Sequence, residues 1–227
     1  MFIVLEGLDG AGKSTQFKLL RDMFAEKGME CEYLHFPRFD APVYGDLIAR
    51  FLRGDLGSLE SVNPYLVALL YAGDRADAAV QINAWLTEGK IVIVDRYVYS
   101  NIGYQCAKVA DSEKRKELKE WILDTEYNRF CIPRPDMSLF LDVPFEFTVA
   151  RLGEQREGDD RSYLQGAEDI HESSLSLQES VRRVYLEAAL SDPTLHVVGC
   201  STENGSMASP QQIFSRICEE INRVAIK

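Results

Sequence analysis

The sequence lacks the features that mark several classes of protein. Its 227 residues contain 25 lysines and arginines against 36 aspartates and glutamates, and the net charge of −11 argues against a nucleic-acid-binding surface. No apolar run approaches the roughly 20 residues of a membrane-spanning helix. The five cysteines are scattered, with no C-x-x-C pair and no histidine beside them at ligand spacing, so we expect reduced thiols.

These absences narrow the expected location and ligands. The first residues are predicted to form a strand rather than a secretory signal, which together with reduced thiols indicates a cytoplasmic protein. A chain this acidic can hold a polyanion only if the ligand is small and bound by a local cluster of positive side chains. We therefore expect no nucleic acid and no membrane among the partners, and the placement of individual arginines becomes informative.

What the sequence does have is a phosphate-binding pattern close to its start. An apolar run at residues 2–5 precedes Gly7-Leu8-Asp9-Gly10-Ala11-Gly12-Lys13-Ser14, which matches G-x-x-x-x-G-K-S ahead of a helical pattern. The glycines let the backbone turn its N–H groups toward phosphate oxygens; Lys13 is expected over those phosphates, and Ser14 is a candidate Mg²⁺ ligand. An ordinary glycine turn is the alternative, but it does not explain the lysine and the hydroxyl.

Apolar segments alternate with helical periodicity along the rest of the chain. This alternation predicts an α/β protein with a three-layer P-loop NTPase-type fold: a five-stranded parallel sheet, helices on both faces and a mobile lid, in one domain over residues 1–227. The expected strands are 2–5, 32–35, 91–94, 138–142 and 195–198. The expected helices are 13–27, 43–52, 64–88, 99–107, 112–130, 144–152, 168–190 and 210–224, and the lid is expected at about 153–166.

The carboxyl ends of the strands are where ligands of such sheets gather, and the third strand ends there in Asp95-Arg96. Asp95 can hold Mg²⁺ or its waters, and Arg96 can clamp a phosphate. The alternative is that Asp95 caps the next helix and pairs with Arg96. Because the phosphate loop reaches the same edge, we expect Lys13 and Arg96 to face each other across one anion-binding cleft.

Aromatic and polar residues near this edge could bind a flat base. Tyr71, Asp74 and Arg75 share one helical face, so the ring could stack on a base and the guanidinium could hydrogen-bond its edge. Periodicity alone favours a half-buried tyrosine beside a solvated ion pair. Phe36 either closes a strand or forms a stacking wall. Three residues on another helical face are, taken singly, most often caps or packing: Ser100, Asn101 and Tyr104.

The lid carries three arginines among acidic residues: Arg151, Arg156 and Arg161. A charged loop is usually only solvated, yet a closing loop can exclude water and deliver an arginine to a transferring phosphoryl group, which increases the rate by about 10³–10⁵. The residues alone leave both readings open. A GTPase switch is disfavoured, because the sequence has no N-K-x-D motif and no D-x-x-G after the third strand.

Together these motifs resemble those of the thymidylate kinase family over residues 1–185. The matching segments are LEGLDGAGKST at 5–15, FPR at 36–38, YAGDR at 71–75, DRYVYSN at 95–101 and PRPD at 133–136. The resemblance implies that ATP donates its γ-phosphoryl group to dTMP with Mg²⁺, giving ADP and dTDP in a step of dTTP synthesis. It also implies a homodimer, for which an apolar face with Val67, Leu70 and Val80 is a candidate contact.

The resemblance implies a role for each matching position. The catalytic residues would be Asp9, Lys13, Arg96, Arg156 and Arg161. ATP would be bound by Gly7, Leu8, Asp9, Gly10, Ala11, Gly12, Lys13, Ser14, Thr15 and Arg151, and Mg²⁺ by Ser14, Asp9 and Asp95. The dTMP would be bound by Asp9, Phe36, Arg38, Tyr71, Arg75, Arg96, Ser100, Asn101, Tyr104 and Tyr163.

Within that set, Arg96 would grip the dTMP phosphate and the developing charge, and Arg38 is a weaker candidate for the same group. Phe36 would stack on thymine, Arg75 would donate to its O4, and Asn101 would meet the base edge. A further position, Tyr104, resembles the ring that disfavours a ribose 2′-hydroxyl.

Two positions depart from the family pattern. One branch has an arginine in the phosphate loop where this chain has Gly10, and the other supplies it from the lid, which fits Arg156 or Arg161. Phe39 stands where a tyrosine is common. No general base is expected, because a nucleoside monophosphate is already largely dianionic near neutral pH. A kinase for another monophosphate and a regulatory nucleotide-binding module remain as alternatives.

Overall fold

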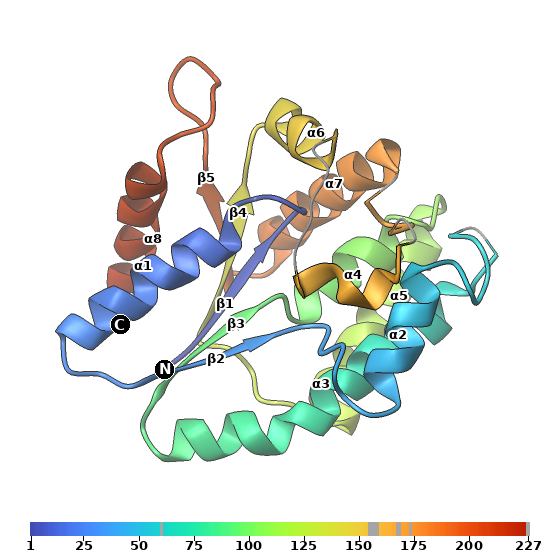
Figure 1. Ribbon diagram of the computed structural model, residues 1–227, viewed down its shortest axis with the longest axis horizontal. Coiled ribbons are helices and arrows are strands. Elements are labelled where there is room, and N and C mark those ends of the chain that lie inside the picture. Colours follow the sequence, from blue (N-terminus) through green and yellow to red (C-terminus); the bar gives the residue numbers. More distant parts are fainter. Residues whose placement is uncertain (60, 154–158, 167–168, 173, 226–227) are drawn as a thin grey trace.

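The computed structural model describes residues 1–59, 61–153, 159–166, 169–172 and 174–225, and its centre is a five-stranded sheet (Figure 1). All strand pairs are parallel, in the order β2-β3-β1-β4-β5, which confirms the predicted parallel sheet. The strands are β1 (Phe2–Gly7), β2 (Cys31–His35), β3 (Ile91–Asp95), β4 (Met137–Asp142) and β5 (Leu195–Gly199).

Helices cover both faces of this sheet, as the alternation predicts. They are α1 (Lys13–Glu26), α2 (Tyr44–Leu52), α3 (Pro64–Thr87), α4 (Val98–Cys106), α5 (Ser112–Leu123), α6 (Phe145–Gly153), α7 (Leu175–Ser191) and α8 (Pro210–Ala225). Helices α1 and α8 lie on one face of the sheet, and α3, α4, α5 and α7 lie on the other (Figure 1). The buried side chains of each set form the core on its face. The result is the expected three-layer α/β arrangement.

The apolar runs of β1 and β3 are explained by burial on both faces. Successive side chains of a strand point to opposite sides, so Phe2 and Val4 enter one core while Ile3 and Leu5 enter the other. The edge strand β2 is half-exposed instead. This central burial fixes β1 and β3 side by side and brings the segments that follow them, the phosphate loop and Arg96, to one edge of the sheet.

Three predicted boundaries were wrong. The helix expected at 112–130 changes at Leu123 into a π-helix, η1 (Asp124–Arg129), in which the Phe130 N–H bonds to the Thr125 carbonyl. Part of the lid, expected as a mobile loop at about 153–166, is a 3₁₀ helix, η2 (Asp159–Leu164). The helix expected from residue 168 begins at Leu175, because the Ser174 side chain caps its first turn.

The segment just before α7 forms turns instead of helix. The carboxylate of Asp169 accepts the N–H groups of His171 and Glu172, and a local side-chain bond of this kind competes with helical backbone bonding. These turns place the His171 ring against Phe51 of α2 and Tyr104 of α4.

The α3 face proposed for dimer contact is partly occupied within the chain. Val67 is fully buried against α2, so its assignment to a contact face was wrong, and Leu70 packs against the same cluster. Val80 is 80% exposed, and Leu66 and Leu69 are exposed on the same helix. In the described part of the chain no helix is long and apolar enough to cross a membrane. The five cysteines, all within the described residues, form no disulfide.

Candidate active site

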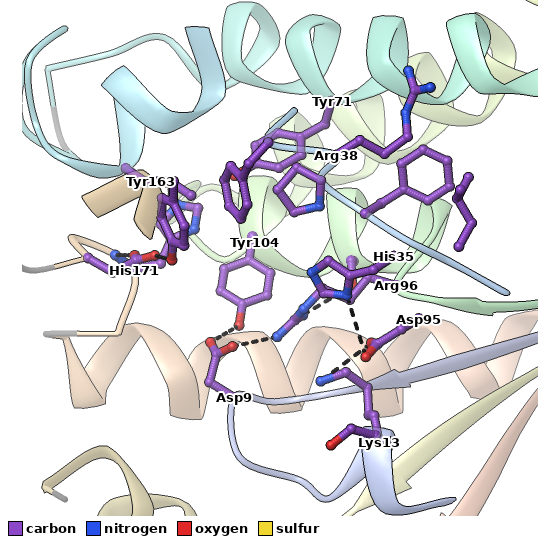
Figure 2. Close-up of a pocket in the computed structure, with 18 of the residues that line it drawn as sticks. Asp9, Lys13, His35, Arg38, Tyr71, Asp95, Arg96, Tyr104, Tyr163 and His171 are labelled. Atoms are coloured by element: carbon purple, nitrogen blue, oxygen red, sulfur yellow. Dashed lines mark hydrogen bonds and ion pairs between the residues drawn. The ribbon is translucent and has the colours of Figure 1, made fainter. Parts of the chain in front are cut away.

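A cavity of about 1430 Å³ lies at the carboxyl ends of β1, β2 and β3. Its walls come from the phosphate loop, the segment after β2, the segment after β3, and parts of α3, α4, η2 and the turns before α7. Lys13 and Arg96 both line it, so the expectation that they share one cleft is confirmed (Figure 2).

The phosphate loop is shaped by two glycines in the left-handed region. Gly10 and Gly12 have φ of 75° and 85°, which side chains disfavour, and Gly12 is the residue before α1. Lys13 begins α1, and its ammonium donates to the carbonyls of Leu8, at 3.2 Å, and Gly7, at 3.5 Å. The loop therefore has the closed turn and the overlying lysine that its sequence predicts, while Ser14 and Thr15 are exposed at the start of the helix.

A buried carboxylate faces this lysine. The Lys13 ammonium lies 3.8 Å from Oδ1 of Asp95, and His35 lies 3.5 Å from the other oxygen. Burial alone would raise the pKa of Asp95, but Lys13, His35 and Arg96 hold it below its usual value, so the carboxylate is charged. Burial, and then the charge of Arg96, lower the pKa of Lys13.

The donor atoms fit a magnesium ion. Oδ1 of Asp95 is buried and accepts no hydrogen bond in the described part of the chain. The exposed Ser14 hydroxyl lies on the next residue after Lys13, and Asp9 contributes a second carboxylate to the same cavity. No group of three His, Cys, Asp or Glu able to hold a metal occurs among the described residues, so an ion here would also need phosphate oxygens or water, as Mg²⁺ prefers.

Arg96 is held in an uncommon backbone conformation by a buried glutamate. Its φ is 66°, and its guanidinium donates to Asp9 at 2.7 Å and to Ser100 at 3.2 Å. The fully buried Glu6 accepts the N–H groups of Tyr97 and Ser100 and so caps the start of α4. Glu6 also accepts the Ser100 hydroxyl, which itself receives the Arg96 bond. Glu6, a residue of β1, thus holds the backbone beside Arg96 through these hydrogen bonds.

Between the phosphate loop and α4, Asp9 is a meeting point of several donors. One of its oxygens accepts the Tyr104 hydroxyl at 2.8 Å, and the other accepts Arg96 (Figure 2). The first oxygen also accepts the Gln178 amide at 3.2 Å. The Arg96 guanidinium lies 5.4 Å from the centre of the Tyr104 ring. This arrangement places a carboxylate, a phenol and a guanidinium at one point of the cavity wall.

The far end of the cavity has an aromatic wall and a buried ion pair. Phe36 is fully buried, Tyr71 stands on α3, and Asn101 stands on α4. Arg75 is 1% exposed and donates two hydrogen bonds to Glu126, whose side chain is 0% exposed. The solvated pair that periodicity favoured for this face is therefore wrong: Arg75 is buried and has a partner from η1.

Arg38 points elsewhere. It donates to the Asp74 carboxylate at 2.8 Å, to the Asp74 carbonyl and to Asp77 at 2.6 Å, and in Figure 2 its guanidinium extends away from Asp9 and Lys13. Although Arg38 lines the cavity, these contacts hold it against α3. The structure thus does not bring Arg38 together with Arg96.

The lid is described in part. Tyr163 lines the cavity; it stacks on Phe39 with ring centres 3.7 Å apart and donates its hydroxyl to Asp169. Arg151 is exposed and lines the cavity. Arg156 lies outside the described residues, and Arg161 lies in η2, where its side chain is not described.

Several residues of this site are not among those predicted from the sequence. Glu6 is a single charge in the apolar first strand, a visible anomaly that could have indicated a buried polar role. Glu126 gave no signal, because it stands among many charged residues of a helical pattern. His171 and Asp169 were hidden by the helix wrongly expected over them; in the structure the His171 ring stacks on Tyr104 at 4.8 Å.

The fold and the cavity define a P-loop nucleotide-binding protein, with the phosphate loop and Arg96 at one end of the cavity and the rings of Phe36 and Tyr71 at the other. A family model described as thymidylate kinase matches residues 5–207. The chain belongs to the thymidylate kinase family.

Proteins named as thymidylate kinases are similar to this chain over most of its length. A probable thymidylate kinase of Thermococcus onnurineus is 35% identical, with 100% of each chain covered. A thymidylate kinase of Mycobacterium tuberculosis is 34% identical over 92% of this chain and 96% of its own length. Among solved structures, a thymidylate kinase from Candida albicans is similar with a TM-score of 0.71 and 26% identity, covering 98% of this chain and 92% of that one.

Proposed function

We propose that this protein transfers the γ-phosphoryl group of ATP to dTMP, with Mg²⁺, giving ADP and dTDP. The single observation that carries the proposal is the convergence of Lys13, Asp95, Arg96 and Asp9 on a cavity whose other end is walled by Phe36 and Arg75. One nucleotide can lie with its base against the wall formed by Phe36 and Arg75 and its phosphate at the charged end. A second phosphate-bearing molecule can then meet it at the charged end. Family membership supports the same activity.

Charge neutralisation provides most of the catalysis in this proposal, because two polyanions must approach in line. The N–H groups of residues 7–15 and Lys13 hold the ATP phosphates. Arg96 exchanges part of its contact with Asp9 for the acceptor phosphate and stabilises the charge that develops on the transferring group. No general base is needed, because the acceptor phosphate is already ionised.

Ser14, Asp95 and Asp9 are the residues that would hold Mg²⁺, which supplies charge neutralisation on the ATP phosphates. Oδ1 of Asp95 supports this assignment, because it is buried and accepts no hydrogen bond from the described residues. At the other end, Phe36 and Tyr71 flank the thymine, and Tyr104 lies beside the sugar, since the sugar must lie between base and phosphate.

Closure of the lid completes the site in this proposal. Arg156 or Arg161 reaches the transferring phosphoryl group, while Arg151 lies on the ATP side and Tyr163 on the acceptor side. The single-domain organisation, the cytoplasmic location and a homodimer through the exposed part of α3 belong to the same proposal. The exposed Leu66, Leu69 and Val80 support such a contact.

An acceptor panel tests the proposed activity. Purified protein with ATP and Mg²⁺ is offered dTMP, dUMP, dGMP, CMP and thymidine, and ADP formation is measured. We expect the highest kcat/KM with dTMP. Preference for another acceptor would support a kinase for that nucleotide instead, and absence of acceptor-dependent ADP formation would support a regulatory nucleotide-binding module.

A further inference from the structure

A buried carboxylate stands behind the base end of the cavity. Glu126 belongs to the π-helix η1, a rare element that occurs often at functional positions. Its side chain is 0% exposed and accepts hydrogen bonds from Nη2 of Arg75, at 2.7 Å, and from Nδ2 of Asn101, at 2.9 Å. Both partners line the cavity, whereas Glu126 does not. Any effect of Glu126 on a ligand therefore acts through these two side chains.

The contact with Glu126 fixes the orientation of the Asn101 amide. Both hydrogens of Nδ2 are used, one by Glu126 and one by the Ala68 carbonyl at 3.0 Å. The amide oxygen must then lie on the opposite branch as an acceptor. That oxygen is buried and has no hydrogen-bond partner in the described part of the chain. A buried acceptor without a partner is costly, so it is suited to a donor that a ligand brings.

Arg75 is oriented by the same carboxylate. Nε and Nη2 both donate to Glu126, which leaves Nη1 as the nitrogen not engaged by it. A guanidinium can only donate. The wall beside Phe36 and Tyr71 thus offers one fixed donor group, from Arg75, and one fixed acceptor, from Asn101.

We propose that Glu126 is a positioning residue that selects the acceptor base: it fixes Arg75 as donor and Asn101 as acceptor, a pair that fits thymine or uracil and rejects cytosine. Thymine and uracil carry a carbonyl at ring position 4 and an N–H at position 3. Cytosine carries an amino group and an unprotonated nitrogen at those positions, so donor would face donor and acceptor would face acceptor. The inference rests on the proposed function, because it assumes that the base of a nucleoside monophosphate lies at this wall.

Glu126→Gln is the direct test, because it keeps the size of the side chain and removes one acceptor. The new amide nitrogen faces a donor, so Arg75 or Asn101 must turn, and a turned Asn101 offers its NH₂ to the cavity. We expect the ratio of dTMP to dCMP affinity, measured by calorimetry without turnover, to fall about 10-fold or more. The ratio of dTMP to dUMP stays unchanged, because both bases present the same donor and acceptor.

Matched variants separate positioning from folding. Glu120→Gln removes the same charge from an exposed position of α5 and is expected to bind all three nucleotides like the wild type. Glu126→Asp keeps the negative charge beside Arg75 but withdraws the carboxylate by one methylene, and is expected to give a smaller loss of dTMP-to-dCMP selectivity. Thermal unfolding of each variant reports whether it is folded. If Glu126→Gln does not fold, the aspartate variant decides.

The outcomes distinguish the two proposals. Wild-type protein that binds none of dTMP, dUMP and dCMP would overturn the proposed function, and this inference with it. Wild-type protein that prefers dTMP, with folded Glu126 variants that keep the same dTMP-to-dCMP ratio, would overturn this inference alone. Equal loss of the dTMP-to-dCMP and dTMP-to-dUMP ratios would show general loosening of the wall and would also overturn it.

Discussion

The two ends of the cavity hold their charges in different ways. At the phosphate end, Arg96 pairs with Asp9 at side-chain exposures of 11% and 21%, and the Lys13 ammonium is 3.8 Å from Asp95. At the base end, Arg75 is enclosed with Glu126 in a two-bond pair with exposures of 1% and 0%. The contacts at the phosphate end can be exchanged for contacts with a ligand's phosphates, whereas the enclosed Arg75–Glu126 pair keeps its orientation. The comparison indicates that turnover and acceptor choice depend on separate residues.

Lys13→Met sharpens the comparison most at the phosphate end. It keeps the apolar stem and removes the ammonium that lies over the loop carbonyls. We expect kcat to fall about 10³-fold, as when one preorganised charged donor is lost, with little change in dTMP affinity. Steady-state kinetics and calorimetry check this, with Lys114→Met on the exposed face of α5 as the control. A matching loss of dTMP affinity would break the separation.

Asp169→Asn tests the region between the ends through pH. Burial, and then the charge of Asp9, raise the pKa of Asp169 to about 6 in the folded protein, above its unfolded value of 3.8. Between these values the folded state holds a proton that the unfolded chain has released. The stability from Asp169 is therefore fully present below about pH 4 and is lost as pH rises through 6.

The expected size of that loss is about 3 kcal/mol over the whole transition, of which about 2 kcal/mol falls between pH 4.5 and pH 7.5. The asparagine keeps an acceptor for the Tyr163 hydroxyl but does not titrate. Urea unfolding at pH 4.5 and pH 7.5 should therefore show a free energy of unfolding that falls by less in Asp169→Asn than in the wild type. Identical falls in the two proteins would rule out Asp169 as the titrating group.

Glu6→Gln tests whether turnover at the phosphate end depends on the hydrogen bonds of the buried Glu6 side chain. Glu6 accepts two backbone N–H groups at the start of α4 together with the hydroxyls of Ser100 and Tyr185, and an amide offers fewer acceptors. We expect a loss of about 1–3 kcal/mol in the free energy of unfolding, because a buried donor loses its partner. The accompanying fall in kcat should be about tenfold, with acceptor selectivity unchanged. Altered acceptor selectivity would show that the phosphate end and the base end of the cavity do not act independently.

The sheet and the phosphate end could be predicted because their signals are local. Apolar runs indicate the buried strands, and the glycines, Lys13 and Ser14 of the phosphate loop all lie within residues 7–14. The meeting of Lys13 with Arg96 then follows from the parallel sheet, which brings both segments to one edge.

The base end could not be predicted, because its geometry depends on a contact between distant segments. Arg75 and Glu126 are 51 residues apart, and neither the burial of the pair nor the π-helix that carries Glu126 has a periodicity signal. The turns before α7 were missed for a related reason. The apolar periodicity extends into them, whereas side-chain bonds of Asp169 and Ser174 to the backbone delay the start of the helix to Leu175.

The most direct test of this account is a paired measurement of kcat and KM for dTMP in Arg96→Ala and Arg75→Ala. We predict that Arg96→Ala lowers kcat about 10²–10³-fold with a small change in KM, because its guanidinium stabilises the developing charge. Arg75→Ala should mainly raise the KM for dTMP. If both variants change kcat and KM to the same extent, the separation of turnover from acceptor recognition is contradicted.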